Sequence, residues 1–150
     1  MRLTYPLVLC FLLLGCVQHR QAEVYELPKD FHGWAVIVWG VTNYPQIPAD
    51  HGKLIERFPT NGIIITSSMQ QLGVAKDEAY SYDANGNRLS VEPTIAVESV
   101  GEMYEGDSKR KLDYTRIFIG TEAQLESAPR EAPQVQQLWD AGYNNQLDPY

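Results

Sequence analysis

Two acid–histidine pairs are the residues of this chain whose types and spacing could support catalysis or metal binding. Asp30 and His32 lie in "DFH", Asp50 and His51 lie in "ADH", and the two stretches flank the apolar run 33–40. Histidine titrates near neutral pH and ligates metals, so either pair could serve as an acid–base or metal-binding group. The alternative, which we favour, is that all four are polar loop residues beside strand ends.

Motifs of the common enzyme classes are missing from the sequence. It contains no Gly-x-Ser-x-Gly, His-Glu-x-x-His, Cys-x-x-Cys or phosphate-binding glycine loop. We therefore assign no catalytic residue, no metal site and no cofactor. The sequence favours a non-catalytic binding or scaffolding protein, and a hydrolase or metal-dependent enzyme that uses His32 and His51 is the alternative.

Both cysteines, Cys10 and Cys16, lie in an N-terminal stretch typical of a signal peptide. Arg2 precedes the apolar run 7–14, which is much shorter than the roughly 20 residues of a membrane-spanning helix. Residues 13–16, Leu-Leu-Gly-Cys, resemble a bacterial lipobox. The resemblance implies cleavage before Cys16 and attachment of a diacylglycerol and a further acyl chain, such as palmitate, to this residue. The alternative is an ordinary secretory signal.

Removal of residues 1–15 would leave an acidic chain of one-domain size. It would have 135 residues, with 11 Lys and Arg against 19 Asp and Glu, and a net charge of −8. Such a chain is poorly suited to nucleic acid and is repelled by anionic lipid, so we expect its membrane attachment to come from the N-terminal lipid. Expected partners are another envelope protein or a cell-wall polymer.

The lipobox resemblance also implies a location, the bacterial cell envelope. In a host with two membranes, Val17 after the cysteine resembles the pattern that permits export to the outer membrane, facing the periplasm. A retention signal would have Asp at this position.

Short apolar runs separated by Gly, Pro, Asn and Asp predict an all-β domain from residue 23 to 120. The run 33–40 is apolar on both alternating faces, which predicts a central strand. Other strands are expected at 23–27, 53–58, 63–68, 78–83, 88–93, 94–105 and 113–120. This number and spacing predict a β-sandwich-like fold of the immunoglobulin or transthyretin kind.

Two turns predict which strands pair. The turn 59–62, Pro-Thr-Asn-Gly, predicts a hairpin between 53–58 and 63–68. Asn85-Gly86 predicts a second hairpin, because both residues accept positive φ at low cost. Asp83, Asn85 and Asn87 also alternate as in a calcium-binding loop, but the glycine and glutamate of that motif are misplaced, which favours a plain turn.

The last 30 residues predict helices instead of strands. Thr121 and Gln124 form a capping-box pattern for a helix ending near 127. A second helix is expected over 134–142, with Val135, Leu138 and Trp139 on one face. The domain plan is therefore a signal peptide (1–15), a tether (16–22), the β domain (23–120) and a helical C-terminal segment with a tail (121–150).

Aromatic and basic residues suggest a third class of function. Tyrosines in or beside the predicted strands could stack on sugars and make a glycan- or peptidoglycan-binding face; they are Tyr44, Tyr80, Tyr82, Tyr104 and Tyr114. Aromatic side chains on strands more often pack in a core or against a cross-strand neighbour. The basic cluster 109–111 is read as a solvated hairpin tip, with contact to acidic lipid or polymer as the alternative.

Three segments in a fixed order carry a family resemblance: "LPKDFHGWAVIVWG", "RFPTNGIIITSS" and "YSYDANGNRL". Together they resemble a family of bacterial lipoproteins that share a domain of unknown function. The resemblance covers about residues 25 to 120 and includes no catalytic motif. It implies a small β-rich domain, and it transfers no functional residue.

Overall fold

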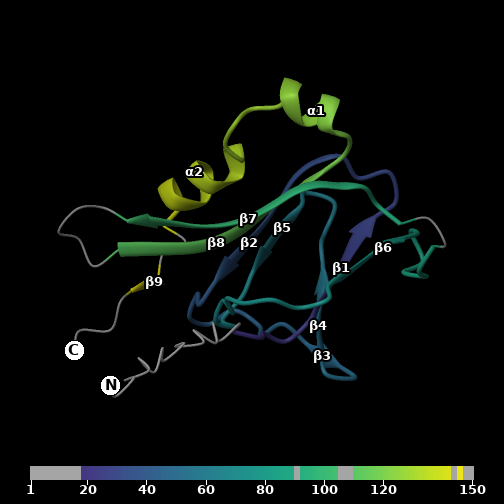
Figure 1. The fold of residues 1–150 in the computed structure, drawn as a ribbon. Coiled ribbons are helices and arrows are strands. Elements are labelled where there is room, and N and C mark those ends of the chain that lie inside the picture. Colours follow the sequence, from purple (N-terminus) through teal and green to yellow (C-terminus); the bar gives the residue numbers. More distant parts are fainter. Residues whose placement is uncertain (1–17, 90–91, 105–109, 143–144, 147–150) are drawn as a thin grey trace, which may run out of the picture.

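The computed structural model describes residues 18–89, 92–104, 110–142 and 145–146. Cys16 and the signal-like segment lie outside these residues. The described part forms two β-sheets with a short helical segment at its C-terminal end (Figure 1). The predicted all-β, sandwich-like class is thereby confirmed. Neither of the two described helices is long and apolar enough to cross a membrane.

The first sheet has the strand order β3-β4-β1-β6. The bounds of its strands are β1 (Glu23–Pro28), β3 (Ala49–Asp50), β4 (Lys53–Arg57) and β6 (Glu78–Tyr82). Both neighbours of β1 run parallel to it, with Glu23 opposite Leu54 and Val24 opposite Glu78. Glu23, Tyr25 and Leu27 alternate with Val24 and Glu26, so the first set faces the second sheet and the other lies on the opposite face of β1, where both residues are also buried.

The second sheet has the strand order β5-β2-β8-β7, and β9 pairs with the end of β8. Its strands are β2 (Gly33–Trp39), β5 (Ile63–Ile65), β7 (Ile95–Tyr104), β8 (Arg110–Ile119) and β9 (Asn145–Gln146). The predicted central strand is β2, whose residues 34–39 are all buried. One face of β2 packs toward the first sheet and the other toward the helical segment, which explains why its sequence is apolar at consecutive positions.

The hairpin predicted between 53–58 and 63–68 is wrong. β4 belongs to the first sheet and β5 to the second, where β5 pairs in parallel with β2. The turn at 59–62 carries the chain across from one sheet to the other. Gly62 has φ +69° and sits against the Phe31 ring, and its carbonyl accepts from the Val36 N–H at 2.8 Å. A glycine turn indicates a change of direction, but it does not specify which sheet receives the next strand.

The turn around Asn85-Gly86 forms as predicted, but the second strand of the predicted hairpin, 88–93, is wrong. In the described residues of that segment, Arg88 makes a single bridge and no strand forms. The Asp83 carboxylate accepts from the backbone N–H groups of Asn85 and Asn87, both at 2.9 Å, and Gly86 has φ +82°. These hydrogen bonds lower the pKa of Asp83. A bridge between Tyr82 and Arg88 closes the turn.

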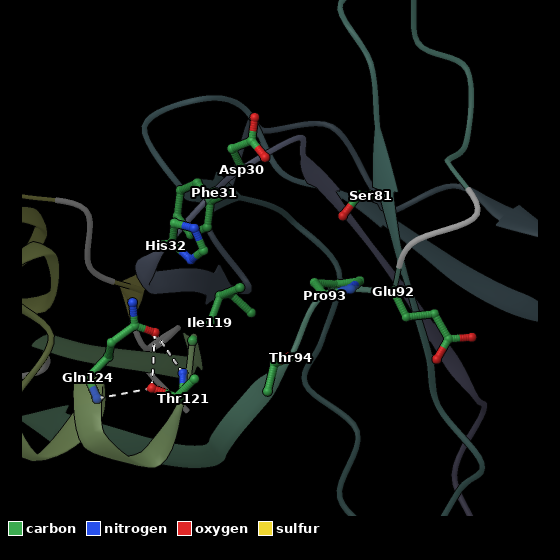
Figure 2. Close-up of a pocket in the computed structure, with 11 residues that line it drawn as sticks. Asp30, Phe31, His32, Ser81, Glu92, Pro93, Thr94, Ile119, Thr121 and Gln124 are labelled. Carbon is green, nitrogen blue, oxygen red and sulfur yellow. Dashed lines mark hydrogen bonds between the residues drawn. The ribbon is translucent and has the colours of Figure 1, made fainter.

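The predicted C-terminal helices are α1 (Glu122–Ser127) and α2 (Pro133–Asp140). The capping box at α1 is confirmed: the Gln124 N–H donates to Thr121 Oγ1 at 3.3 Å, and the Thr121 N–H donates to Gln124 Oε1 at 2.8 Å (Figure 2). Helix α2 begins with proline at its first position, where a missing N–H costs nothing.

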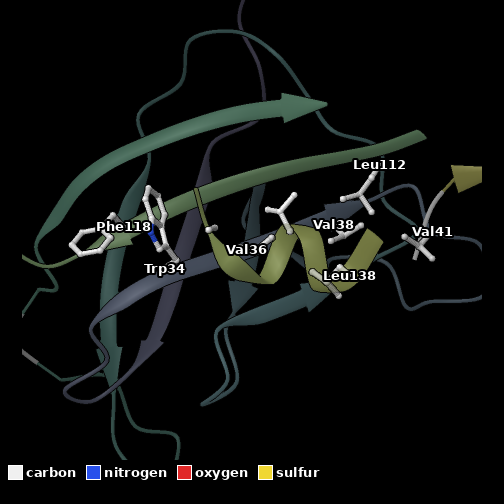
Figure 3. Packing of buried hydrophobic residues seen from close by; sticks show 9 residues of the cluster. Trp34, Val36, Val38, Val41, Leu112, Phe118 and Leu138 are labelled. Carbon is white, nitrogen blue, oxygen red and sulfur yellow. The ribbon is translucent and has the colours of Figure 1, made fainter. Parts of the chain in front are cut away.

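Two hydrophobic cores lie on opposite faces of the second sheet. The core between the sheets contains Tyr25, Leu27, Ala35, Ile37, Trp39, Phe58, Ile117 and Ile119. The other lies between the second sheet and the helical segment, where Leu138 of α2 joins Val36, Val38 and Leu112 (Figure 3). Trp34 Nε1 also donates to the Pro129 carbonyl at 3.0 Å. The helical segment is therefore packed on the β domain.

Candidate functional site

The first acid–histidine pair, Asp30 and His32, lies in the loop between β1 and β2, at the rim of a cavity of about 240 Å³ (Figure 2). Ser81, Glu92 and Gln124 also line this cavity. In the described part of the chain, no hydrogen bond or ion pair joins the side chains of Asp30 and His32. The cavity is partly open and is lined by apolar residues, among them Phe31 and Ile119, as well as polar ones. Among the described residues, no hydrogen bond joins His32 to Ser81, so the cavity shows no base paired with a nucleophile.

The second pair, Asp50 and His51, lies in the turn between β3 and β4. Nδ1 of His51 is 2.8 Å from Oδ1 of Asp50, and the two side chains are 92% and 69% exposed. His51 has φ +48°, a conformation typical of a tight turn. An exposed pair of this kind is solvated on most sides, so it lacks the enclosure that catalysis requires.

The structure does not bring the two pairs together. β4 runs parallel to β1, with Leu54 opposite Glu23, so the turn that holds His51 lies where β1 begins. The loop that holds His32 follows the other end of β1. Six residues of strand, at about 3.3 Å each, separate these ends by about 20 Å. A site that uses both histidines does not form in this arrangement.

The predicted tyrosine face is also dispersed. Arg88 lies 4.5 Å from the centre of the Tyr80 ring and Arg57 lies 5.3 Å from that of Tyr82, so arginines stack on these two rings. Tyr44 and Tyr114 pack against the core beneath the helices. The side chain of Tyr104 lies outside the described residues. The four tyrosines whose side chains are described therefore form no single stacking platform.

The basic cluster at 109–111 is described only in part. Lys109 and the side chain of Arg110 lie outside the described residues. Lys111 Nζ is 2.9 Å from both Glu102 and Asp113, so this cation is paired on the surface of β8.

A partly buried acidic cluster, which sequence reasoning missed, lies between the two sheets at the end where β1 begins; Glu23 and Glu56 are buried, and Glu98 is at its exposed edge. We define it as Glu23, Glu56, Asp77 and Glu98, together with Arg20 and Tyr25. Tyr25 Oη lies 2.7 Å from Glu23 Oε2 and 2.9 Å from Glu98 Oε1. Oxygens of Glu23, Asp77 and Glu98 lie within 4.8 Å of one another, a spacing that could hold a metal ion.

Arg20 already occupies this acidic cluster. Its guanidinium donates to both carboxylate oxygens of Asp77, at 2.9 and 2.5 Å, and lies 3.3 Å from Glu23. The backbone N–H of Glu23 donates to the same Asp77 carboxylate at 2.8 Å. Part of the acidic charge is therefore neutralised by the chain itself, and the cluster fastens the N-terminal segment to the domain.

Glu56 is the most enclosed acid of the cluster. Its side chain is fully buried, and both carboxylate oxygens are without a hydrogen-bond partner in the described structure. Burial, followed by the charges of Glu23 and Glu98, raises its pKa well above the ordinary value. Burial likewise raises the pKa of Glu23. Protonation is the simplest way to reduce the repulsion among these carboxylates.

The N-terminal segment is held against the domain before β1 begins. The Val74 N–H donates to the Gln18 carbonyl at 2.9 Å, and the Arg20 N–H donates to the Val74 carbonyl at 3.3 Å. The sequence predicts a tether over residues 16–22. In the structure, the described part of that segment is fixed by these bonds and by the acidic cluster.

The sequence contains only weak signals for the acidic cluster and for the attachment of the N-terminal segment. Glu23 occurs in the strand pattern Glu-Val-Tyr-Glu-Leu, in which a glutamate facing inward resembles one facing solvent. Asp77 and Glu98 lie far along the chain, and only the topology brings them to Arg20.

The chain is similar to one protein family and to a solved structure. The family described as "Family of unknown function (DUF6843)" matches residues 19–128. No curated protein matches the chain. A crystal structure described as "Putative Lipoprotein from Bacillus anthracis" has a similar fold, with a TM-score of 0.61 over 81% of this chain and 91% of that chain. The two sequences are 19% identical, so this similarity concerns the fold.

Proposed function

The chain belongs to DUF6843, a family of unknown function, and from that premise we propose that it is a lipid-anchored, non-catalytic protein of the bacterial cell envelope. Its domain would bind or scaffold another envelope component. The proposed anchor is a diacylglycerol thioether on Cys16, formed after residues 1–15 are removed.

The observation that carries this proposal is the position of the lipobox-like sequence relative to the folded domain. Leu-Leu-Gly-Cys ends at residue 16, and the chain is hydrogen-bonded to the domain from Gln18 onward. Cleavage before Cys16 would thus remove the apolar segment and leave the domain whole. The "Putative Lipoprotein" with a similar fold adds support.

A non-catalytic role is supported by the placement of the polar residues. The two acid–histidine pairs lie at opposite ends of β1, and Arg20 and Tyr25 already engage the carboxylates of the acidic cluster. The partner would be an envelope protein or a cell-wall polymer, and in a two-membrane host Val17 favours the outer membrane.

The proposal is tested by the intact mass of the mature protein from a membrane fraction, beside a Cys16→Ser variant. We expect wild type to have the mass of a chain beginning at Cys16 plus acyl groups, and the variant to lack the acyl groups and leave the membrane fraction. A wild-type mass without lipid would overturn the anchor and indicate a secreted, soluble domain.

A further inference from the structure

The loop of residues 69–74 exposes apolar side chains where a surface loop normally exposes polar ones. Met69, Leu72 and Val74 are 71%, 57% and 58% exposed. The glutamines between them are used for attachment. Gln70 Nε2 donates to the Tyr114 carbonyl at 3.2 Å and to Thr115 Oγ1 at 3.0 Å, and Gln71 Oε1 accepts from the Gln21 N–H at 3.1 Å.

Exposure of these apolar side chains to water is unfavourable unless another molecule covers them. Polar side chains hold the loop to the domain, and apolar side chains are left to face outward. Exposed apolar residues that occur singly need no explanation, but a cluster of them indicates a contact surface. Three such residues within six positions form a cluster of this kind.

The fourth large apolar residue that is exposed in the described structure lies beside the same loop. Val100 of β7 is 54% exposed and is the cross-strand partner of Thr115. Thr115 is the residue to which Gln70 donates. All four exposed large apolar residues of the described chain therefore lie in this loop or on the strand beside it.

The same loop holds the first described residues of the chain. Val74 is hydrogen-bonded to Gln18 and Arg20. A Cβ atom on Gly73 would lie 2.5 Å from the Gln18 carbonyl oxygen, so the two segments approach closely enough to require glycine. The apolar loop and the exit of the N-terminal chain are thus parts of one surface.

Covalent geometry limits how far this surface can be from Cys16. Two residues of fully extended chain span at most about 7 Å, and Cys16 is two residues before Gln18. The Cα atom of Cys16 is therefore within about 7 Å of that of Gln18, and acyl chains on its side chain would enter a bilayer close to the backbone that contacts Val74. No longer spacer separates the domain from the lipid surface.

We propose that Met69, Leu72 and Val74 form a membrane-contact surface that inserts among the lipid headgroups beside the acyl anchor. This inference rests on the lipid anchor of the proposed function. The contact is apolar in character, which suits a domain whose acidic net charge opposes electrostatic attraction to anionic lipid. The anchor brings the domain to the bilayer, and the apolar loop fixes which end faces it.

The test uses the full lipidated protein reconstituted in vesicles of phosphatidylethanolamine and phosphatidylglycerol. An environment-sensitive fluorophore is attached to Leu72→Cys, and in a second preparation to Ala123→Cys on α1, at the far end of β1. Both positions are exposed. Lipidation occupies the thiol of Cys16 and cleavage removes Cys10, so the introduced cysteine takes the label. Quenching by phospholipids that carry a nitroxide near the headgroup reports contact with the bilayer.

We expect quenching at position 72 to be several-fold greater than at position 123, with a blue-shifted emission at 72 only. Equal and weak quenching at both positions would overturn the membrane-contact surface. Protection of position 72 that depends on protein concentration and not on quencher lipids would also overturn it, because a second copy would then cover the loop. The intact mass measured first on the same sample separates this failure from failure of the anchor.

Discussion

Arg20 and Asp77 are joined by two hydrogen bonds across 57 positions of sequence, Nη1 to Oδ1 at 2.9 Å and Nη2 to Oδ2 at 2.5 Å. The pair is largely enclosed, because the arginine side chain is only 9% exposed. It fastens the N-terminal segment to the residues that lead into β6. The attachment of that segment is therefore set by an ion pair and not only by strand pairing.

Removal of this ion pair should destabilise the domain. Asp77→Ala removes both bonds to Arg20 and the bond from the Glu23 N–H, and leaves the guanidinium without its main partner. We expect a loss of about 2–3 kcal/mol in the free energy of unfolding, measured with urea. The control is Glu131→Gln, whose 72% exposed carboxylate pairs with Arg116 and should contribute less than about 1 kcal/mol. Equal effects would show that the Arg20–Asp77 pair is no better than a surface pair.

Glu56 should make stability depend on pH. The pKa of Glu56 is raised above its ordinary value of 4.5 in the folded state. Above pH 4.5, folding is therefore accompanied by the uptake of a proton at this carboxyl. The stabilising contribution is then present below pH 4.5 and is lost as the pH rises toward the folded pKa. Unfolding free energies measured from pH 5 to 8 should decline in wild type and decline less in Glu56→Gln.

The matched control for Glu56 is Glu122→Gln, an exposed glutamate in the first turn of α1. It should leave the wild-type slope unchanged. A Glu56→Gln profile parallel to that of wild type would show that Glu56 stays ionised in the folded protein.

The central strand should be sensitive to loss of volume. Val38 is fully buried between β5 and β8 and faces the core beneath α2 (Figure 3). Val38→Ala should cost about 2–3 kcal/mol, through lost burial and the cavity left behind. Val100→Ala removes the same atoms from a 54% exposed position and should cost less than about 0.5 kcal/mol. Similar melting temperatures for the two variants would contradict the central position of β2.

Gly73 should be essential for holding the N-terminal segment. Gly73→Ala introduces a Cβ at 2.5 Å from the Gln18 carbonyl oxygen, so the hydrogen bond from the Val74 N–H to that oxygen should be lost. Faster hydrogen exchange of the Val74 amide is the expected result. The control, Gly33→Ala, also alters a glycine of positive φ, but its Cβ would meet open space. The Val74 amide should therefore exchange in this variant as in wild type. Unchanged exchange in Gly73→Ala would mean that the segments move apart at little cost.

The histidines should be dispensable for function. Because His32 and His51 lie at opposite ends of β1, the double variant His32→Ala, His51→Ala should fully rescue any phenotype of a deletion strain. Cys16→Ser in the same strain should fail to rescue, since it removes the proposed anchor. Failure of the histidine variant, with normal protein levels, would revive the enzyme alternative.

The sequence predicted the elements that depend on local pattern. The buried strand 33–39, the Asn85-Gly86 turn and the capping box at Thr121 each arise from residues close together in the chain, whose side chains limit the local conformation. The assignment of β4 and β5 to different sheets was missed because a Pro-Thr-Asn-Gly turn is compatible with both a hairpin and a crossing.

The acidic cluster could not be predicted for a different reason. Its members lie up to 78 positions apart, from Arg20 to Glu98, and each carboxylate taken alone looks like a surface residue. Glu56 illustrates this, because neither alternating face of its strand, Lys-Leu-Ile-Glu-Arg, is wholly apolar, so the pattern does not show which face is buried. Only the parallel register that puts Glu56 opposite Tyr25 turns it into the interior.

The direction of β1 has a consequence for what other molecules can reach. β1 begins at the end of the molecule that holds the apolar loop and runs away from it for six residues. If that end contacts the bilayer as proposed, β1 places the loop bearing Asp30 and His32, and the cavity beside it, as much as about 20 Å from the lipid surface. The cavity rim and α1 would then face the aqueous compartment and be accessible to molecules dissolved in it.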